Sequence, residues 1–262
     1  MLAAWLVAVQ PATQAADAAP PAPRWESTAN LGFTLTSGNS ESVLFTAGLA
    51  TQRKEPKNEY IFGASVAYGE AKPGGNDDAD MEKNTDSARA LAQWNHLFSE
   101  KAYMYARADL VHDDIANVMY RVMLSPGAGY YFIKTEKTTL AGEVGPGYVF
   151  ERTLNRFNVS TNIEPDGILD HYDNNDYATI RFAERFQHQI SKSARVWQTL
   201  EYLPEITDWA ENWILNAEVG IAADIVKNLA VSVVLQDSYD NDPPEGRENN
   251  DLRVIAGVQY KF

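Results

Sequence analysis

The segment "LRVIAGVQYKF", residues 252–262, follows a strict period of two up to its last residue. Its apolar set is Leu252, Val254, Ala256, Val258, Tyr260 and Phe262, and the residues between them are Arg253, Ile255, Gly257, Gln259 and Lys261. Successive side chains of a β-strand point to opposite faces, so this alternation predicts a strand with two unlike faces.

The same period recurs from Trp25 onward and predicts about twelve strands. We place them at 24–37, 41–53, 59–70, 84–97, 100–113, 118–133, 138–152, 175–190, 194–207, 211–226, 229–240 and 249–262. Many of these runs exceed ten residues, whereas strands of soluble sheets average about five or six. A tilted strand needs about 9–11 residues to cross a bilayer, so the predicted lengths favour a membrane barrel.

The connections between these runs fall into two sets. One set is short and carries a net charge of +6, while the opposite set is mostly longer and carries −18. Outer-membrane barrels have short periplasmic turns and longer external loops. A soluble sandwich offers no reason for such segregation, although a secreted soluble β-protein remains the alternative reading.

Composition excludes several other classes. No uninterrupted apolar stretch reaches the 18 or so residues of a transmembrane helix, which excludes a helical membrane protein. The net charge of −14 argues against nucleic acid as a partner, because phosphate binding needs a concentrated basic surface. The chain has no cysteine, so disulfides, thiolate catalysis and cysteine-ligated metals are absent.

The N-terminus differs in composition from the rest. The apolar run "LAAWLVAV" at 2–9 and the small residues Ala16-Asp17-Ala18 resemble an export signal with a cleavage site, although no basic residue precedes Arg24. We therefore expect a signal peptide at 1–18, either complete or truncated at its start, a flexible Ala/Pro leader at 19–24, and a barrel at 25–262. An N-terminal helix of the folded domain is the alternative for the apolar run.

These observations together predict an all-β fold: a transmembrane, antiparallel, up-and-down β-barrel of about twelve strands in a bacterial outer membrane. Aromatic residues cluster where apolar strand faces end, as in the interfacial girdles of such barrels. A last strand that ends in Tyr260 and Phe262 resembles the C-terminal assembly signal of this class. It is expected to pair with the first strand, so that no sheet edge is left exposed.

Three segments also resemble a known family. "LGFTLTSGNSES" at 31–42, "YRVMLSPGAGYYFIKTEKTTLAGEVGPGYVFE" at 120–151 and the terminal "GVQYKF" are similar to the salt-induced outer membrane proteins, a bacterial family defined by a domain of unknown function. The resemblance covers about 25–262. It implies an outer-membrane barrel and a link to osmotic conditions, and it brings no substrate or catalytic residue.

The face predicted to line the lumen carries most of the charged candidates. The lumen-lining candidates are Arg89, Tyr103, Tyr105, Arg107, Asp109, Arg121, Glu143, Arg181, Arg185, Glu201, Glu218 and Arg253, and Arg195 and Asp224 share their register. Buried charges must be neutralised by partners, so a paired network filling the barrel is favoured over an arginine-lined solute path. Inward glycines, among them Gly48, Gly129 and Gly220, are expected to leave space along part of the wall.

Other site types have weaker signals. The acidic segments 74–84, 170–176 and 240–251 offer oxygen ligands for Ca²⁺ or Mg²⁺ but lack a complete binding pattern, so we expect solvated loops, no metal and no cofactor. His112-Asp113-Asp114 at an outer strand end is the one candidate for a rim-located, lipid-modifying enzyme, and no G-x-S-x-G motif accompanies it.

The sequence therefore predicts a protein that is not an enzyme. We expect an envelope-stress or structural barrel, or a narrow channel for small solutes. Its expected partners are outer-membrane lipid and lipopolysaccharide, and the barrel-assembly machinery during biogenesis.

Overall fold

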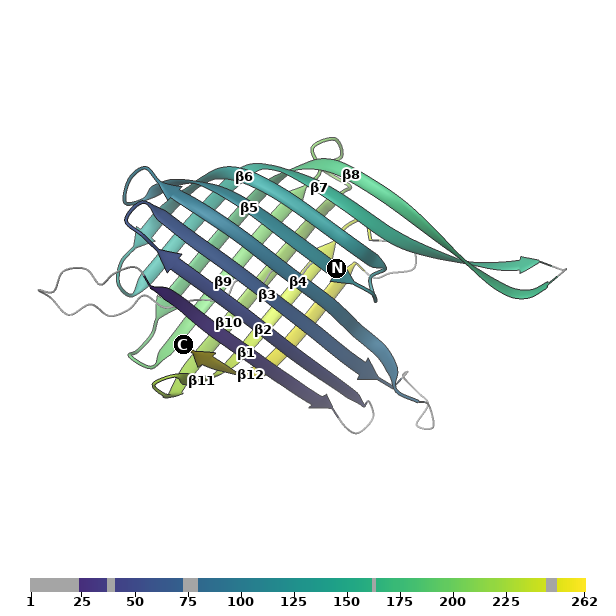
Figure 1. Cartoon of the computed structure of the whole chain (residues 1–262), viewed down its shortest axis with the longest axis horizontal. Coiled ribbons are helices and arrows are strands. Elements are labelled where there is room, and N and C mark those ends of the chain that lie inside the picture. The colour runs from purple at the N-terminus through teal and green to yellow at the C-terminus, as the bar shows by residue number, and fades with distance from the viewer. Residues whose placement is uncertain (1–23, 37–40, 73–79, 162–163, 244–248) are drawn as a thin grey trace, which may run out of the picture.

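The computed structural model describes residues 24–36, 41–72, 80–161, 164–243 and 249–262. The expected signal peptide and all of the leader except Arg24 lie outside the described residues. Twelve strands form a closed barrel in which each strand pairs antiparallel with its neighbours in the chain, and β1 pairs with β12 (Figure 1). The strands are β1 (Trp25–Thr36), β2 (Ser42–Lys54), β3 (Asn58–Ala71), β4 (Glu82–Leu97), β5 (Ala102–Asp113), β6 (Val118–Lys134), β7 (Thr138–Thr161), β8 (Glu164–Gln189), β9 (Ala194–Pro204), β10 (Trp213–Val226), β11 (Leu229–Asp240) and β12 (Asn250–Lys261). The predicted fold class and strand count are confirmed.

The two faces of the barrel invert the usual arrangement of a water-soluble fold. On β12, Leu252 and Val254 are exposed on the outside, whereas Gln259 faces inward and is buried. The period of two places these residues on opposite sides of the wall. Within the described part of the chain, no helix is long and apolar enough to cross a membrane.

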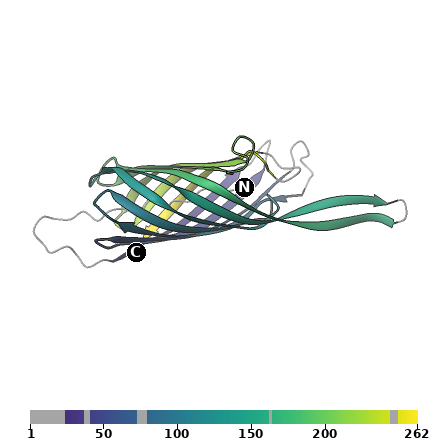
Figure 2. The same ribbon diagram turned by 90° about the horizontal axis from the view of Figure 1, so that it is seen from above.

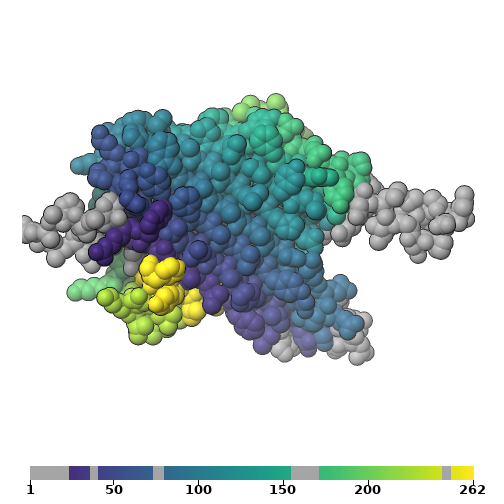
Figure 3. All heavy atoms as spheres, in the orientation of Figure 1, coloured from purple at the N-terminus to yellow at the C-terminus, as the bar shows by residue number. Residues whose placement is uncertain are grey.

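Both chain ends of the barrel meet at one rim, as an even number of strands requires. Ser27 and Phe262 exchange backbone hydrogen bonds of 3.1 and 3.0 Å, so the final residue takes part in closure. In the space-filling view the C-terminal residues lie beside the first strand (Figure 3). Tyr260 and Phe262 point outward, and their rings stack with centroids 6.1 Å apart.

The hairpin of β7 and β8 departs from the prediction. Residues 153–175 were expected to form a long loop, but the two strands stay paired as far as Thr161 and Glu164. The hairpin projects well beyond the rest of the barrel (Figures 1 and 2). A hairpin in water satisfies its backbone groups by pairing, yet neither face needs to be apolar. The alternation that marks a membrane strand is therefore absent from its sequence.

Candidate functional site

The twelve lumen-lining candidates all lie on the inner face. Eight of them are buried: Tyr103, Tyr105, Arg107, Arg121, Glu143, Arg181, Glu201 and Glu218. The other four, Arg89, Asp109, Arg185 and Arg253, are half-buried. Strand geometry explains the grouping, because alternate residues of one strand share a face. β5, for example, projects Tyr103, Tyr105, Arg107 and Asp109 into the lumen in succession.

Glu143 on β7 is the centre of the largest polar cluster. Its side chain is 0% exposed and accepts hydrogen bonds from Gln93 Nε2 at 2.9 Å, Tyr103 Oη at 2.8 Å and Arg181 Nη1 at 2.8 Å. Arg185 also donates to Glu143. These five residues, here called the Glu143 cluster, come from β4, β5, β7 and β8. Because β4 and β7 are not neighbours in the sheet, the cluster crosses part of the lumen.

A second carboxylate balances the cluster's charge. Arg181 Nε donates to Glu201 Oε1 at 2.5 Å, and Asn216 Nδ2 lies 3.5 Å from Glu201 Oε2. The Arg181 guanidinium also lies 5.3 Å from the centre of the Tyr105 ring. Arg181 and Arg185 thus face Glu143 and Glu201, which satisfies the requirement that buried charges be paired.

The polar network continues through uncharged residues that the sequence reasoning missed. Gln93 Nε2 also lies 2.9 Å from Asn95 Oδ1, and Asn95 donates to Glu59 at 3.0 Å. Tyr131 on β6 donates to the same Glu59 oxygen at 2.8 Å. Their signal was available, since each occupies an inward position in the alternation. The prediction named the tyrosines of β5 and many inward charged residues, and it left out the neutral side chains and Glu59.

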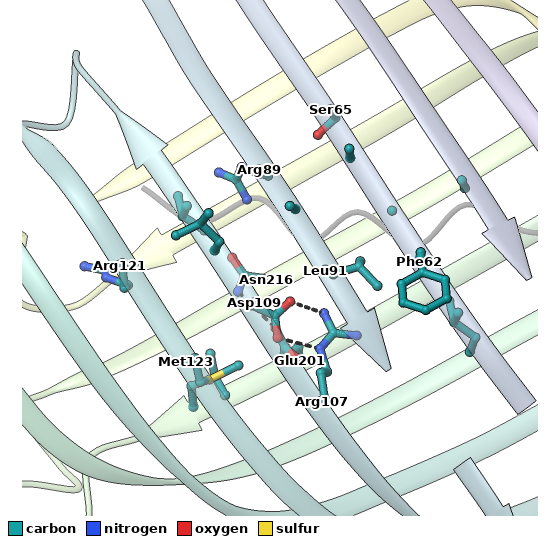
Figure 4. Close-up of a pocket in the computed structure, with 18 of the residues that line it drawn as sticks. Phe62, Ser65, Arg89, Leu91, Arg107, Asp109, Arg121, Met123, Glu201 and Asn216 are labelled. Atoms are coloured by element: carbon teal, nitrogen blue, oxygen red, sulfur yellow. Dashed lines mark hydrogen bonds and ion pairs between the residues drawn. The ribbon is translucent and has the colours of Figure 1, made fainter. Parts of the chain in front are cut away.

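Arg107 forms a fork with Asp109 two residues further along β5. Its Nε and Nη2 donate to the two carboxylate oxygens at 2.7 and 2.6 Å. Its Nη1 reaches Gln93 Oε1 at 3.2 Å, which joins this pair to the Glu143 cluster. Figure 4 shows the fork on the wall of a cavity.

A separate ionic contact braces the outer half of the lumen. Arg121 on β6 pairs with Glu151 on the adjacent strand β7. Its Nη2 also lies 3.6 Å from Asp240 Oδ2 on β11, five strands away in the barrel. We call this set of three residues the outer brace. All three side chains are at most 8% exposed, so the ionic contact is shielded from solvent.

Between the outer brace and the Glu143 cluster the lumen is largely apolar. Met123, Val149, Leu203 and Ile214 are buried against one another, and Tyr177 packs on them. A cavity of about 60 Å³ adjoins this apolar cluster. Its polar lining includes Arg89, Arg107, Asp109, Arg121 and Glu201, several of which point toward one another in Figure 4.

Glu218 lies outside the ionic network. It accepts hydrogen bonds from Trp197 Nε1 at 2.6 Å and from Gln236 Nε2 at 2.9 Å. Among the described residues no ion pair reaches it. Trp197 itself packs with Ala222, Val234 and Ile255, so the carboxylate borders an apolar part of the inner wall.

Inward glycines do not all provide space, which corrects part of the expectation. A Cβ added at Gly129 would collide with the Tyr103 ring, and one added at Gly220 would collide with Trp197. Each glycine is directly paired with that aromatic residue across neighbouring strands, so the ring fills the missing side chain's place. Gly48 behaves as expected, since the nearest atom to an added Cβ is 3.5 Å away.

The remaining charged candidates form smaller contacts near the two rims. Arg253 lies 3.4 Å from Asp251, and Lys261 lies 2.8 Å from Asp224. Arg195 lies 3.6 Å from Asp224 and also donates to Gln259 across the barrel. Lumenal arginines are therefore distributed among several carboxylates and do not form a continuous ladder.

The geometry adds little support for the other two site types, a catalytic site at His112 and a metal site in the acidic segments. His112 Nδ1 lies 2.9 Å from the carbonyl of Met119, while Asp113 accepts the backbone N–H of Ala116 at 2.9 Å. Asp113 thus caps a turn and does not orient the imidazole. In the described portion of the sequence, no group of three or more His, Asp or Glu residues is arranged to hold a metal ion. Parts of the acidic segments 74–84 and 240–251 fall outside that portion.

Comparison with solved structures shows a shared fold. An outer membrane channel from Pseudomonas putida F1 is similar with a TM-score of 0.50 and 10% identity, over 96% of this chain and 100% of that chain. The translocator domain of the autotransporter NalP from Neisseria meningitidis gives a TM-score of 0.48 and 13% identity, over 91% and 87%. The NanC porin gives 0.48 and 7%, over 90% and 100%.

The search of curated proteins found no match. A family model described as a protein of unknown function, DUF481, matches residues 29–262. This span contains most of β1 and the whole of the other eleven strands, so the chain belongs to the DUF481 family.

Proposed function

We propose that the protein is an outer-membrane β-barrel whose braced lumen passes only small solutes at a low rate. The observation that carries this proposal is the contact between Arg121 and Asp240, which joins opposite parts of the wall. Eight strands already give a filled interior, whereas sixteen leave a wide aqueous channel. A twelve-stranded barrel lies between these cases, so its side chains decide how much of the lumen stays open.

The outer-membrane location is supported by the surface of the barrel. Large apolar side chains such as Leu35, Leu110 and Val233 are exposed on its outside, and water does not favour such a surface. The closed sheet leaves a lipid-exposed wall whose backbone groups are mostly paired, as the hydrocarbon phase requires. We propose that the partners of this surface are outer-membrane lipid and lipopolysaccharide, and that the barrel-assembly machinery inserts it.

A narrow path is supported by the two polar layers. The Glu143 cluster and the outer brace each join strands that are not adjacent, and the apolar cluster around Met123 lies between them. A hydrated ion must therefore pass charged side chains that are already paired and a cluster of apolar side chains. Both features lower conductance, because an ion gives up hydration without gaining a free counter-charge.

The test is a conductance recording in planar bilayers. The native protein is expected to show small steps, and Arg121→Ala is expected to increase them by releasing Asp240 and Glu151. The freed carboxylates should also shift selectivity toward cations. Arg107→Ala should change the conductance in a similar way. Arg53→Ala is a matched control, since Arg53 pairs with Glu55 near the periplasmic rim.

Two results would overturn the proposal. Conductance equal to that of a wide general porin would contradict the braced lumen, and an Arg121→Ala variant with native conductance would remove the role of the brace. A lipid-release assay on the same preparations, with His112→Ala as the variant, tests the enzyme alternative. The proposed link to salt is tested by deleting the gene and comparing growth at low and high osmolarity.

A further inference from the structure

The seam between β1 and β12 is paired over only part of its length. Five residue pairs join the two strands, from Thr28 with Lys261 to Gly32 with Gly257. By contrast, twelve pairs join β1 to β2 and eleven join β11 to β12. Both strands continue toward the outer rim, yet within the described residues they make no further pairs with each other. In Figure 1 they lie together beside the C-terminus and diverge toward the other end.

The register shows which backbone groups are left facing the gap. Ser27 and Phe262 exchange their N–H and C=O groups, and the pattern of antiparallel pairing repeats every second residue. Continued pairing would therefore join Phe33 to Ala256 and Leu35 to Val254. Instead these residues present unpaired groups at an opening in the wall. Such groups are costly in contact with hydrocarbon, so the opening must admit water or an occupant.

A cavity of about 40 Å³ lies just inside the seam, at the edge of this opening. Its lining includes Gly32 and Gly257 from the paired part of the seam, Ile255 from the margin of the opening, and Trp197 and Val234 from the inner wall. The Ile255 side chain packs against Gly32, since its Cγ2 lies 2.6 Å from the position of an added Cβ. Ile255 also packs with Trp197 and Val234, so it joins the margin of the opening to an apolar patch of the inner wall.

The margins of the opening are also apolar. Phe33, Leu35, Leu252 and Val254 are all more than half exposed on the outer surface. Val254 pairs with Leu235 on β11, which pairs in turn with Val219 on β10, so the opening lies within the apolar band of the barrel. Apolar side chains therefore continue from the outer surface, through the opening, to Trp197.

We propose that this opening is a lateral portal through which an acyl chain of a lipid or other amphipathic molecule enters the lumen. The chain would lie against Val234, Ile255 and the ring of Trp197. Glu218 already accepts two hydrogen bonds beside that ring, so an acyl chain needs no polar contact there. The proposal goes beyond solute conduction, because the path leads sideways into the membrane and not along the barrel axis.

The first experiment tests whether the outer half of the seam is open. The chain has no native cysteine, so engineered pairs are unambiguous. Asn30→Cys with Gln259→Cys lies in the paired part and is expected to form a disulfide rapidly under mild oxidation. Thr34→Cys with Ile255→Cys would be the equivalent pair if pairing continued, and it is expected to oxidise at least ten times more slowly. Equal rates would show a closed seam and overturn the proposal.

The second experiment tests the occupant. A variant with Trp197 as its only tryptophan is reconstituted in vesicles of phosphatidylcholine with brominated acyl chains, which quench tryptophan on contact. Trp197 is 4% exposed and faces the lumen, so quenching requires entry of a chain. A bis-maleimide tether between Thr34→Cys and Ile255→Cys is expected to reduce this quenching at least twofold.

A variant with Trp94 as its only tryptophan is the control, because Trp94 lies on the outer surface and should be quenched with or without the tether. Heat-modifiable migration on gels verifies that each variant is folded. Trp197 fluorescence that is insensitive to bromine, or quenching that the tether leaves unchanged, would overturn the proposal. Covalent dimers formed by Thr34→Cys alone would also overturn it, since they would show that a second copy covers the open edges.

Discussion

Arg121 on β6 and Asp240 on β11 lie 3.6 Å apart across the lumen, although four strands lie between β6 and β11 around the wall. A contact of this kind limits the width of the barrel more directly than strand number does. Removing Arg121 would leave both Asp240 and Glu151 without this counter-charge, which is the costly case for buried ion pairs. The contact therefore braces the lumen across its width.

Glu143→Gln should destabilise the barrel by about 3 kcal/mol, because breaking a buried ion pair leaves a cation uncompensated. Arg185 would lose the carboxylate that it contacts, while Arg181 would keep Glu201. Urea unfolding in lipid vesicles, followed by tryptophan fluorescence, measures the change. The control is Glu136→Gln in an exposed turn, for which a change within about 0.5 kcal/mol is expected. Adding Arg185→Met to Glu143→Gln should restore part of the loss, and no restoration would contradict the pairing.

Gly129→Ala should lower stability by about 1–3 kcal/mol, the usual cost of overpacking, because the added methyl group meets the Tyr103 ring. Gly48→Ala should change little, since its nearest neighbour would be 3.5 Å away. The temperature at which the folded band disappears on gels gives the comparison. If both variants behave alike, the aromatic ring does not occupy the glycine's place. Tyr103→Leu also removes the hydrogen bond to Glu143, so the test is a comparison: Gly129→Ala should cost less stability in the Tyr103→Leu background than in the native chain.

Two changes at Phe262 should distinguish the contribution of its ring to assembly from that of its backbone hydrogen bonds. Phe262→Ala keeps the two hydrogen bonds to Ser27 and removes the exposed ring, whereas deletion of the residue removes both. We expect each change to lower the amount of assembled barrel in the membrane, and deletion to lower it further. Phe98→Ala is the control, because Phe98 is 66% exposed in a turn, close to the 63% of Phe262. Native membrane levels after deletion would remove the assembly role.

Removing the projecting part of the β7–β8 hairpin should leave the barrel intact. Replacing residues 155–171 by Asn-Gly joins Leu154 to Tyr172 through a two-residue turn that suits a hairpin. The strand pairs of the described residues in this stretch all lie within the stretch itself, so the temperature of heat-modifiable migration should stay within a few degrees. Deleting Gly145 and Pro146 instead shortens β7 inside the barrel and should prevent assembly. A large loss of stability in the first variant would show that the projection supports the wall.

The strands were predictable from the sequence because a membrane barrel places unlike solvents on its two faces. Alternation located β12 to within two residues of its bounds, since lipid-facing Val254 and Val258 flank inward Ile255 and Gly257. The same signal fails for the outer part of β7 and β8, where water surrounds both faces. The strands are defined there by their backbone pairing alone, and backbone pairing does not require polar and apolar residues to alternate along the sequence.

The candidate site was only partly predictable. Alternation indicates that Arg181 and Glu143 face inward, but it does not indicate that they meet, because their distance depends on the pairing register of β7 and β8. Neutral residues such as Gln93 carry no charge signal, yet Gln93 links Glu143 to Arg107. The expectation that inward glycines leave open space was partly wrong for a related reason. Whether Gly129 leaves space depends on the residue paired with it, which a linear sequence does not show.

The short seam between β1 and β12 has a consequence for folding. Every other ladder joins strands that are neighbours in the chain, and local hairpins form at small entropic cost. Closing the ring instead brings together segments more than 200 residues apart, and this closure is stabilised by five residue pairs and the adjoining contact of Ser27 with Phe262. The ring should therefore close last during assembly, after a nearly complete sheet has formed. On unfolding, the same seam should be the first to part, turning the cylinder back into an open sheet.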